Sequence, residues 1–444
     1  MNDNIHPIKQ SKTGIFWFSN DLRLHDNPAL TQASKLVDKL LCVYVVDYGW
    51  QSSSFYSQAN VSQNSRRFLR ESLSDLASSL KEIGQHLCVF HSQAEPTLSH
   101  LIREVGASDV FRSENAGWYE NRSWNELKAN HIGIKFHSVH SHTLHDSSTL
   151  PFNYSDLPKS FSNFKAAMSG IEVLKPIATL TALPPSPATD LPEFTSYESN
   201  NTATVFCGGE RQGLAHLGGY FATEKPMSYK DVRNAIDGWD NSCKFSPWLA
   251  NGSLSVREAA AALDGYEKTI AANESTYWIY FELLWREYFQ WYAHKHGSKL
   301  FSLMGIKRLS PLTSFYPERF QKWIHGSTPY PLVNACMNEL RDTGYLSNRG
   351  RQIVASCLVN ELAMDWRYGA AYFEQALVDY DVASNWGNWQ YLAGVGADTR
   401  AKRHFNLEKQ TQQFDADGRY IRLWDGDKDL QPLDSVDAAD WPIR

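Results

Sequence analysis

Residues 379–391, DYDVASNWGNWQY, combine side chains that suit redox chemistry better than they suit an ordinary core. Asp379, Asp381 and Asn385 are interleaved there with two tryptophans. Two carboxylates among large indoles are costly to bury unless partners satisfy them. An amide can donate or accept a hydrogen bond, so it can follow a ring nitrogen whose protonation changes, and an indole can donate an electron to such a ring. The alternative is a Trp-rich helix in an ordinary core, and the partners of the buried polar groups decide between the two.

A second polar segment, NSCKFSPWLANGSLS at residues 241–255, combines small hydroxyls and a cation with a helix that starts at a proline. Hydroxyls and free backbone N–H groups at a helix start suit a pyrophosphate, because the helix dipole favours anions there. Ordinary helix capping explains Ser246 and Pro247 equally well. The segment therefore leaves both interpretations open.

A third segment, FELLWREYFQ at residues 281–290, places three chemically different side chains on one helix face. Glu282, Trp285 and Arg286 are spaced at i, i+3 and i+4, and residues at these spacings are neighbours on a helix surface. On their own they can also be a surface ion pair beside a packed tryptophan.

The composition describes a large globular protein with no general attraction for nucleic acid. The 444 residues provide for a sizeable core and two or three domains. With 43 basic and 49 acidic residues the net charge is −6, so a nucleic-acid site must be a local basic patch. The six cysteines form no CxxC pair, which predicts free thiols in a reducing compartment. No leader and no apolar run of membrane-spanning length is found, so we expect a cytoplasmic protein without a membrane partner.

The N-terminal part alternates between two kinds of pattern. Short β-rich runs at residues 14–18, 40–46, 87–91 and 134–139 are separated by helical patterns, notably the apolar positions of residues 68–83. This alternation predicts βαβ units and a parallel sheet with helices on both faces. No GxGxxG motif follows the first strand, so a Rossmann-like sheet without its dinucleotide fingerprint is expected.

The rest of the chain is predicted to be helical. A stretch at residues 175–204 is rich in Pro, Ser and Thr and has no periodicity, which predicts an interdomain linker. Amphipathic helical patterns follow at residues 209–221, 255–266, 277–293 and 333–344. The expected fold class is therefore α/β plus all-α, with an N-terminal α/β domain at residues 1–145, a linker at 146–206 and a helical domain at 207–444.

Four stretches of the sequence together resemble the photolyase/cryptochrome family, and within it the cryptochrome DASH branch. They are WFSNDLRLHDNPAL at 17–30, SNRGRQIVASCLVNELAMDWRYG at 347–369, DYDVASNWGNWQYLAGVGADTRAKRHFNLEKQ at 379–410 and FDADGRYIRLW at 414–424. The resemblance implies a monomeric FAD protein that uses light to repair cyclobutane pyrimidine dimers and prefers single-stranded DNA. RNA is a further candidate partner. The alternative is a blue-light photoreceptor that binds FAD and nucleic acid, with little or no repair.

The resemblance also assigns roles to individual residues, and it implies no metal. The residues that would contact FAD are Tyr229, Ser242, Cys243, Lys244, Phe245, Ser246, Arg286, Arg351, Asp379, Asp381 and Asn385. Asn385 would face the flavin N5, and Cys243 stands where family members usually have a hydroxyl residue. The residues that would contact damaged DNA are Arg233, Glu282, Trp285, Asn348, Arg349, Gln352 and Tyr391. Those with catalytic roles would be Glu282, Trp285, Asn385, Trp389 and Trp366.

The resemblance further implies a chain of tryptophans that conducts electrons to FAD. Trp389 and Trp366 lie 23 positions apart, which matches the inner two members of this chain. The third position is occupied by Thr313, which cannot carry a hole. We expect Trp323, or secondarily Tyr316, to replace it as the outer member.

Two more features follow from the branch that the sequence resembles. Gln352 and Tyr391 stand where photolyases for double-stranded DNA tend to have Met and Trp. A pocket with Gln and Tyr is smaller and more polar, so it offers less stacking energy to offset the cost of extruding a dimer from a duplex. A methenyltetrahydrofolate antenna is implied between the domains, with Glu120 as its contact and Glu114 as a competing candidate. For both carboxylates the alternative is a solvated surface position.

Overall fold

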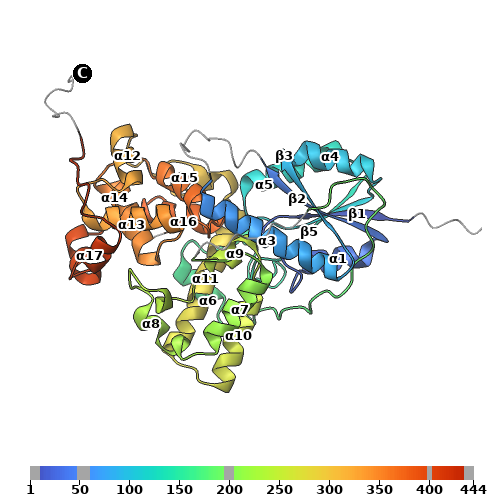
Figure 1. Ribbon diagram of the computed structural model, residues 1–444, viewed down its shortest axis with the longest axis horizontal. Coiled ribbons are helices and arrows are strands. Elements are labelled where there is room, and N and C mark those ends of the chain that lie inside the picture. The colour runs from blue at the N-terminus through green and yellow to red at the C-terminus, as the bar shows by residue number, and fades with distance from the viewer. Residues whose placement is uncertain (1–10, 48–60, 195–204, 398–402, 435–444) are drawn as a thin grey trace, which may run out of the picture.

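The structure, a computed structural model, describes residues 11–47, 61–194, 205–397 and 403–434 (Figure 1). Its N-terminal part is a parallel five-stranded sheet with the order β3-β2-β1-β4-β5. The register pairs Thr13 with Lys39 and Gly14 with Asp109. The strands are β1 (Thr13–Phe18), β2 (Lys39–Asp47), β3 (Leu87–Ser92), β4 (Asp109–Ser113) and β5 (Lys135–Val139).

Alternation along the strands builds two separate cores, one on each face of the sheet. Phe16 and Phe18 pack under α1 (Pro28–Leu36) and α3 (Gln63–Glu82). Ile15 and Trp17 pack on the other face, under α4 (Ala94–Glu104) and α5 (Trp118–Asn130). Successive side chains of a strand point to opposite faces, so a strand that is apolar throughout must be covered twice. The predicted α/β class with helices on both faces is confirmed.

Strand β4 was not among the predicted strands, because polar residues dilute its sequence DVFRS. All five residues are nevertheless buried, and their polar groups have partners. His137 contacts Asp109 at 2.8 Å, and the Ser113 hydroxyl donates to Asp21 at 2.5 Å. A buried polar strand is stable once such bonds are made, but they are invisible to hydrophobic periodicity.

The segment proposed as the linker, residues 146–206, is not uniform. It contains η1 (Tyr154–Asp156) and α6 (Phe161–Ala167), and Phe161 and Phe164 belong to the core of the helical domain. Residues 171–194, all of them described, then run without helix or strand along the sheet domain. There the Gln85 side chain donates to the Pro184 carbonyl at 2.8 Å.

The C-terminal part is helical, as predicted, and Figure 1 shows it beside the sheet domain. The long α11 runs through it and packs against α8 and α16. A capping box of Asn273 and Thr276 starts α11, and Gly297, with φ 50°, follows its end. The elements are α7 (Glu210–Phe221), η2 (Lys225–Ser228), α8 (Tyr229–Val232), η3 (Trp239–Asn241), α9 (Ser246–Asn251), α10 (Val256–Thr269), α11 (Glu274–His296), η4 (Gly297–Phe301), α12 (Pro317–His325), α13 (Pro331–Thr343), α14 (Asn348–Asn360), α15 (Trp366–Ala376), α16 (Val382–Leu392), α17 (Leu407–Phe414) and α18 (Arg419–Leu423).

A group of buried charges, the interdomain clamp, joins the two parts; it consists of Arg23, His25, Asp26, Glu210 and Arg257. Arg23 donates to the backbone carbonyls of Gly252 at 2.8 Å and Ser141 at 2.5 Å. Arg257 donates to Asp26 at 2.8 Å, and Glu210 accepts from the backbone N–H of His25 at 2.8 Å. Within the described parts of the chain, no helix combines the length and the apolar character needed to cross a membrane.

Candidate functional site

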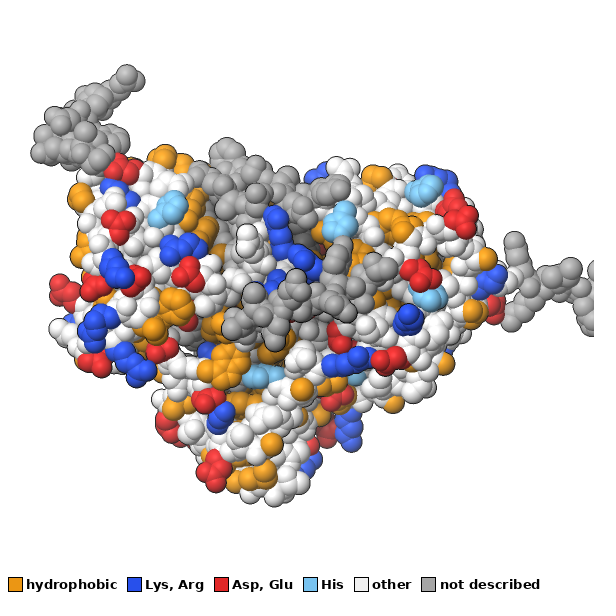
Figure 2. Space-filling model, in the orientation of Figure 1, with side chains coloured by type: hydrophobic (Ala, Val, Ile, Leu, Met, Phe, Trp, Pro, Cys, Tyr) orange, Lys and Arg blue, Asp and Glu red, His pale blue; other side chains and the backbone are white. Residues whose placement is uncertain are grey.

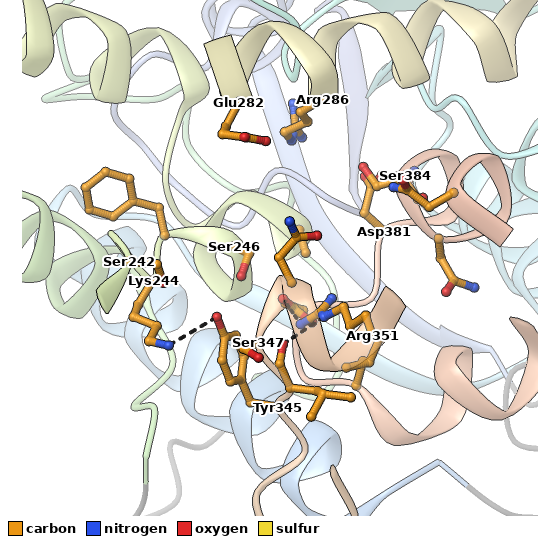
Figure 3. A pocket seen from close by; sticks show the side chains of 18 of the residues that line it. Ser242, Lys244, Ser246, Glu282, Arg286, Tyr345, Ser347, Arg351, Asp381 and Ser384 are labelled. Atoms are coloured by element: carbon orange, nitrogen blue, oxygen red, sulfur yellow. Dashed lines mark hydrogen bonds and ion pairs between the residues drawn. The ribbon is translucent and has the colours of Figure 1, made fainter. Parts of the chain in front are cut away.

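A cavity of about 310 Å³ lies in the helical domain, between α11 and the first turns of α9, α14 and α16 (Figure 3). Figure 3 shows Glu282 and Arg286 reaching it from α11, Lys244 from one side and Asp381 from the opposite side. All the residues predicted to contact the cofactor line this cavity: Tyr229, Ser242, Cys243, Lys244, Phe245, Ser246, Arg286, Arg351, Asp379, Asp381 and Asn385.

Two helices begin at the cavity because the sequence caps them there. The Ser347 hydroxyl accepts from the backbone N–H of Gly350 at 3.1 Å and starts α14. The Asp381 carboxylate accepts from the N–H of Ser384 at 2.7 Å and starts α16. Helix starts present unpaired N–H groups and a partial positive charge, so this side of the cavity suits anionic groups.

The two carboxylates among the tryptophans both have partners. Arg351 donates to both oxygens of Asp379, at 2.8 and 3.0 Å, and the Asp379 side chain is only 1% exposed. Gln290 donates to the second oxygen of Asp381 at 2.8 Å. Asp379 and Asp381 also line the cavity. The arrangement is therefore a polar binding site and not an ordinary Trp-rich core.

The orientation of the Asn385 amide is set by one hydrogen bond. Its NH₂ group donates to the Ala370 carbonyl at 2.9 Å, inside the protein. Its carbonyl oxygen therefore remains as the group that can accept a hydrogen bond from a ligand in the cavity. Such an acceptor fits a ring nitrogen that becomes protonated on reduction.

Glu282 and Arg233, predicted to contact different parts of a DNA substrate, pair with each other. Burial raises the pKa of the Glu282 carboxyl, and Arg233 opposes this shift. Arg233 also lies over the ring of Trp278, 4.2 Å from its centroid. The sequence contains no signal for this pair, because the two residues are far apart in the chain and neither spacing nor composition relates them.

The other residues predicted to contact DNA divide into two groups. Asn348 and Gln352 line the cavity. Trp285, Tyr391 and Arg349 lie outside its lining. Trp285 and Tyr391 meet edge to face with ring centroids 5.9 Å apart, and Arg349 donates to Asn234 at 3.2 Å.

Phe161 is a neighbour of Trp285 that sequence reasoning missed. Its ring stacks on Trp285 with a centroid distance of 3.7 Å. It comes from the segment predicted to be a linker, in which no pattern marks it as a site residue.

The two tryptophans of the expected electron path each contact another tryptophan. Trp389 lines the cavity and lies edge to face with Trp323, 6.4 Å between centroids. Trp366 lies edge to face with Trp386 at 5.8 Å. Trp323 is fully buried, and so is Trp366, so burial does not distinguish the two residues. Trp323 and the half-buried Tyr316 both stay predictions for the outer member.

Glu120 lies in the first turn of α5, where it interacts electrostatically with Arg112 and with Asp381 of the cavity lining. Its carboxylate packs closely over Gly117 at the helix start. Burial raises the pKa of Glu120, and it raises the pKa of Glu374 to about 7. Trp386 donates to Glu374 at 3.2 Å. Glu120 is therefore not the solvated surface carboxylate of the alternative interpretation.

Two protein-family models match the chain: "DNA photolyase" over residues 14–187 and "FAD binding domain of DNA photolyase" over residues 278–428. A protein of Idiomarina loihiensis named Cryptochrome DASH is 49% identical over 98% of this chain and 97% of its own length. A Cryptochrome DASH of Vibrio parahaemolyticus is 47% identical over 98% of both chains. Among solved structures, a Synechocystis cryptochrome matches with a TM-score of 0.88 and 37% identity, over 93% of this chain and 88% of that one.

Proposed function

Because this chain belongs to the photolyase/cryptochrome family, with relatives named Cryptochrome DASH over nearly its whole length, we propose that it is a light-driven FAD enzyme that repairs cyclobutane pyrimidine dimers, with a preference for single-stranded DNA. The observation that carries the proposal is the cavity lining. It combines a fixed amide acceptor at Asn385 with the buried Arg351–Asp379 pair and the hydroxyls of Ser242 and Ser246.

The residues present fit FAD. The hydroxyls, Lys244 and the starts of α14 and α16 offer donors to a pyrophosphate. Asn385 would offer an acceptor to the N5 position, and Arg351 with Asp379 would border the ring. Reduced, photoexcited FAD supplies the electron that opens the dimer. The one departure is Cys243, a weak hydrogen-bonding group where a hydroxyl is usual in the family.

Glu282 is the group that acts on the damaged base. Its raised pKa favours the protonated carboxyl, which can donate a hydrogen bond to a base carbonyl as negative charge develops there. For this it must leave Arg233, and a DNA phosphate is the natural new partner for the Arg233 guanidinium. Substrate binding would then exchange one ion pair for another and release the carboxyl for the base.

The preference for single strands rests on the size of the stacking surface. One face of Trp285 is already covered by Phe161, at a centroid distance of 3.7 Å, so less of the indole remains for an extruded dimer. Extrusion from a duplex costs a few kcal/mol, which stacking must offset. In single-stranded DNA that cost is small.

Binding of DNA must rely on local charge. Figure 2 shows basic and acidic side chains interspersed over the visible face, in keeping with the net charge of −6. The cations that we expect to contact DNA phosphates are Arg233, Arg349, Arg403 and Lys402, and the last of these lies outside the described residues. A few phosphate contacts of this kind predict affinity that falls as salt rises.

The proposal is tested on three DNA substrates that carry the same dimer: a single strand, a duplex, and a duplex with a mismatch bubble at the dimer. Under blue light and with reduced FAD, we expect dimer loss in the single strand to be at least about tenfold faster than in the duplex, because extrusion costs a few kcal/mol. The bubble should recover most of the difference. Equal rates on all three substrates would contradict the extrusion argument. Absence of repair on every substrate would exclude the enzyme and favour the photoreceptor.

A methenyltetrahydrofolate antenna at Glu120 is part of the same proposal. Glu120 lies partly buried at the domain boundary, and Tyr119 and Phe301 provide neighbouring rings with centroids 5.4 Å apart. A bound folate would add a near-ultraviolet absorption band to the flavin bands of the purified protein. We expect this band to weaken in Glu120→Ala; an unchanged band in that variant would place the antenna elsewhere.

A further inference from the structure

Three histidines and a glutamate gather where the sheet domain meets the C-terminal half of α11. Glu114 follows β4, His140 and His142 follow β5, and His294 lies in the last turns of α11. None of them lines the cavity described above. One ligand atom each of Glu114, His140 and His294 can be chosen so that all three lie within 4.8 Å of one another.

The Glu114 carboxylate lies between two imidazole rings. One of its oxygens is 3.2 Å from His140 Nε2, and the other is 4.0 Å from His294 Nδ1. The ring centroids of His140 and His294 are 5.5 Å apart, and the ring of His142 lies 6.0 Å from that of His294. The donors thus converge from three separate segments on one small volume.

The histidines carry ring nitrogens that the protein does not satisfy. His140 Nδ1, His142 Nε2 and His294 Nε2 are buried without a hydrogen-bond partner among the described residues. The His294 side chain is only 8% exposed. In His140 and His294 the unpartnered nitrogens are not the ones nearest Glu114, which are His140 Nε2 and His294 Nδ1. A buried polar atom without a partner costs about 1–3 kcal/mol, so each ring keeps a nitrogen available to a ligand or to ordered water.

The chemistry of the converging groups suits a metal ion. Imidazole nitrogens and a carboxylate oxygen are donors that a divalent transition metal accepts, and the metal binds the neutral form of an imidazole.

We propose that Glu114, His140 and His294 form a binding site for Zn²⁺, or for another divalent transition metal with the same preference for nitrogen and oxygen ligands, and that His142 stands beside them as a further donor. Two imidazoles and a carboxylate are a ligand set that zinc accepts, whereas Mg²⁺ and Ca²⁺ require more oxygens. Zinc bonds of 2.0–2.1 Å place tetrahedral ligands about 3.3 Å apart, so small side-chain rotations are enough to close the site.

The site would join the two domains. Glu114 and His140 belong to the sheet domain and His294 to the helical domain, so one ion would cross-link them. It would also act on the cavity at a distance, because the backbone carbonyl of His142 accepts from Arg286 at 2.6 Å, and Arg286 lines the cavity. An ion that orders the segment from His140 to His142 thus helps to position Arg286. The role is structural and requires no change in the flavin chemistry.

The test uses the full-length, FAD-loaded protein without a histidine tag, stripped with a chelator and dialysed against Zn²⁺ or Mg²⁺. We expect one tightly bound Zn²⁺ per chain and no Mg²⁺ at the same concentration, with metal measured by atomic emission. Loss of an outer partner of a metal ligand typically weakens binding 10- to 100-fold, so loss of a ligand in His140→Ala or His294→Ala should weaken it by at least about 100-fold. His325→Ala is the matched control, since His325 is an exposed histidine on α12 that contacts the Gln321 carbonyl. Equal zinc binding by wild type, His140→Ala and His294→Ala would overturn the proposal.

A measurement on the unmodified protein covers the case in which a variant does not fold. The zinc X-ray absorption spectrum of the wild type should show nitrogen and oxygen neighbours at about 2.0–2.1 Å with the multiple scattering of imidazole. Sulfur neighbours at about 2.3 Å would mean that cysteines hold the ion, and the proposal would then be wrong. Neither measurement depends on repair activity, so the outcome is independent of the proposed function.

Discussion

Replacement of Arg351 by Ala should destabilise the protein by about 3–5 kcal/mol, because it leaves the Asp379 carboxylate buried without its cation. The Asp379 side chain is 1% exposed, and both of its oxygens accept from Arg351. Unfolding by denaturant, followed by circular dichroism, measures the loss. The same variant should release FAD more readily, which the ratio of flavin to protein after gel filtration reports.

The second member of the pair supplies the control. In the double variant Arg351→Ala, Asp379→Asn no charge is left without a partner, so it should recover part of the stability lost in Arg351→Ala. A double variant that is as unstable as the sum of the two single variants would show that the two residues act independently. In that case the pair would not be a unit of the site.

The protein with Trp389→Phe should lose most of its ability to photoreduce bound FAD with an external reductant. Trp389 lines the cavity, and phenylalanine is a much poorer hole carrier than tryptophan. Photoreduction is followed by the decay of flavin absorbance under blue light, after confirmation that the variant retains FAD. Photoreduction at the wild-type rate would contradict the assignment of Trp389 as the inner electron donor.

Two further substitutions decide where the path continues. Trp366→Phe should slow photoreduction, and so should Trp323→Phe, because Trp323 is predicted to carry the hole and its ring meets Trp389 edge to face with centroids 6.4 Å apart. The wild-type rate in Trp323→Phe would leave Tyr316 as the candidate for the outer member. The two variants are matched, since both residues are large, buried indoles. If Trp323→Phe photoreduces slowly and Trp366→Phe photoreduces at the wild-type rate, the electron path runs through the contact of Trp323 with Trp389.

What sequence reasoning could predict depends on whether the relevant physics is local. The apolar β1 and β2 and the amphipathic α3 follow from side-chain periodicity, and the structure contains them. Strand β4 does not, because its polar residues are satisfied by partners elsewhere in the chain. Propensity alone carries no information about such partners.

The site shows the same division. The resemblance named residues from separate segments that the structure gathers around one cavity, such as Tyr229, Arg351 and Asn385. The sequence could suggest Trp323 as an electron carrier, but it could not show that the Trp323 ring meets Trp389 with centroids 6.4 Å apart. The stacking of Phe161 on Trp285 was equally beyond reach, because it depends on how a segment without periodicity folds back.

The interdomain clamp bears on the speed of the proposed repair cycle. It joins the domains through buried charged groups whose hydrogen-bond directions are narrow, so a hinge between the domains would break several bonds at once. The two domains should therefore move as one body. Under the proposed function, turnover then needs no closing and reopening of a lid-like domain, and its rate should be limited by the arrival of damaged DNA and of photons.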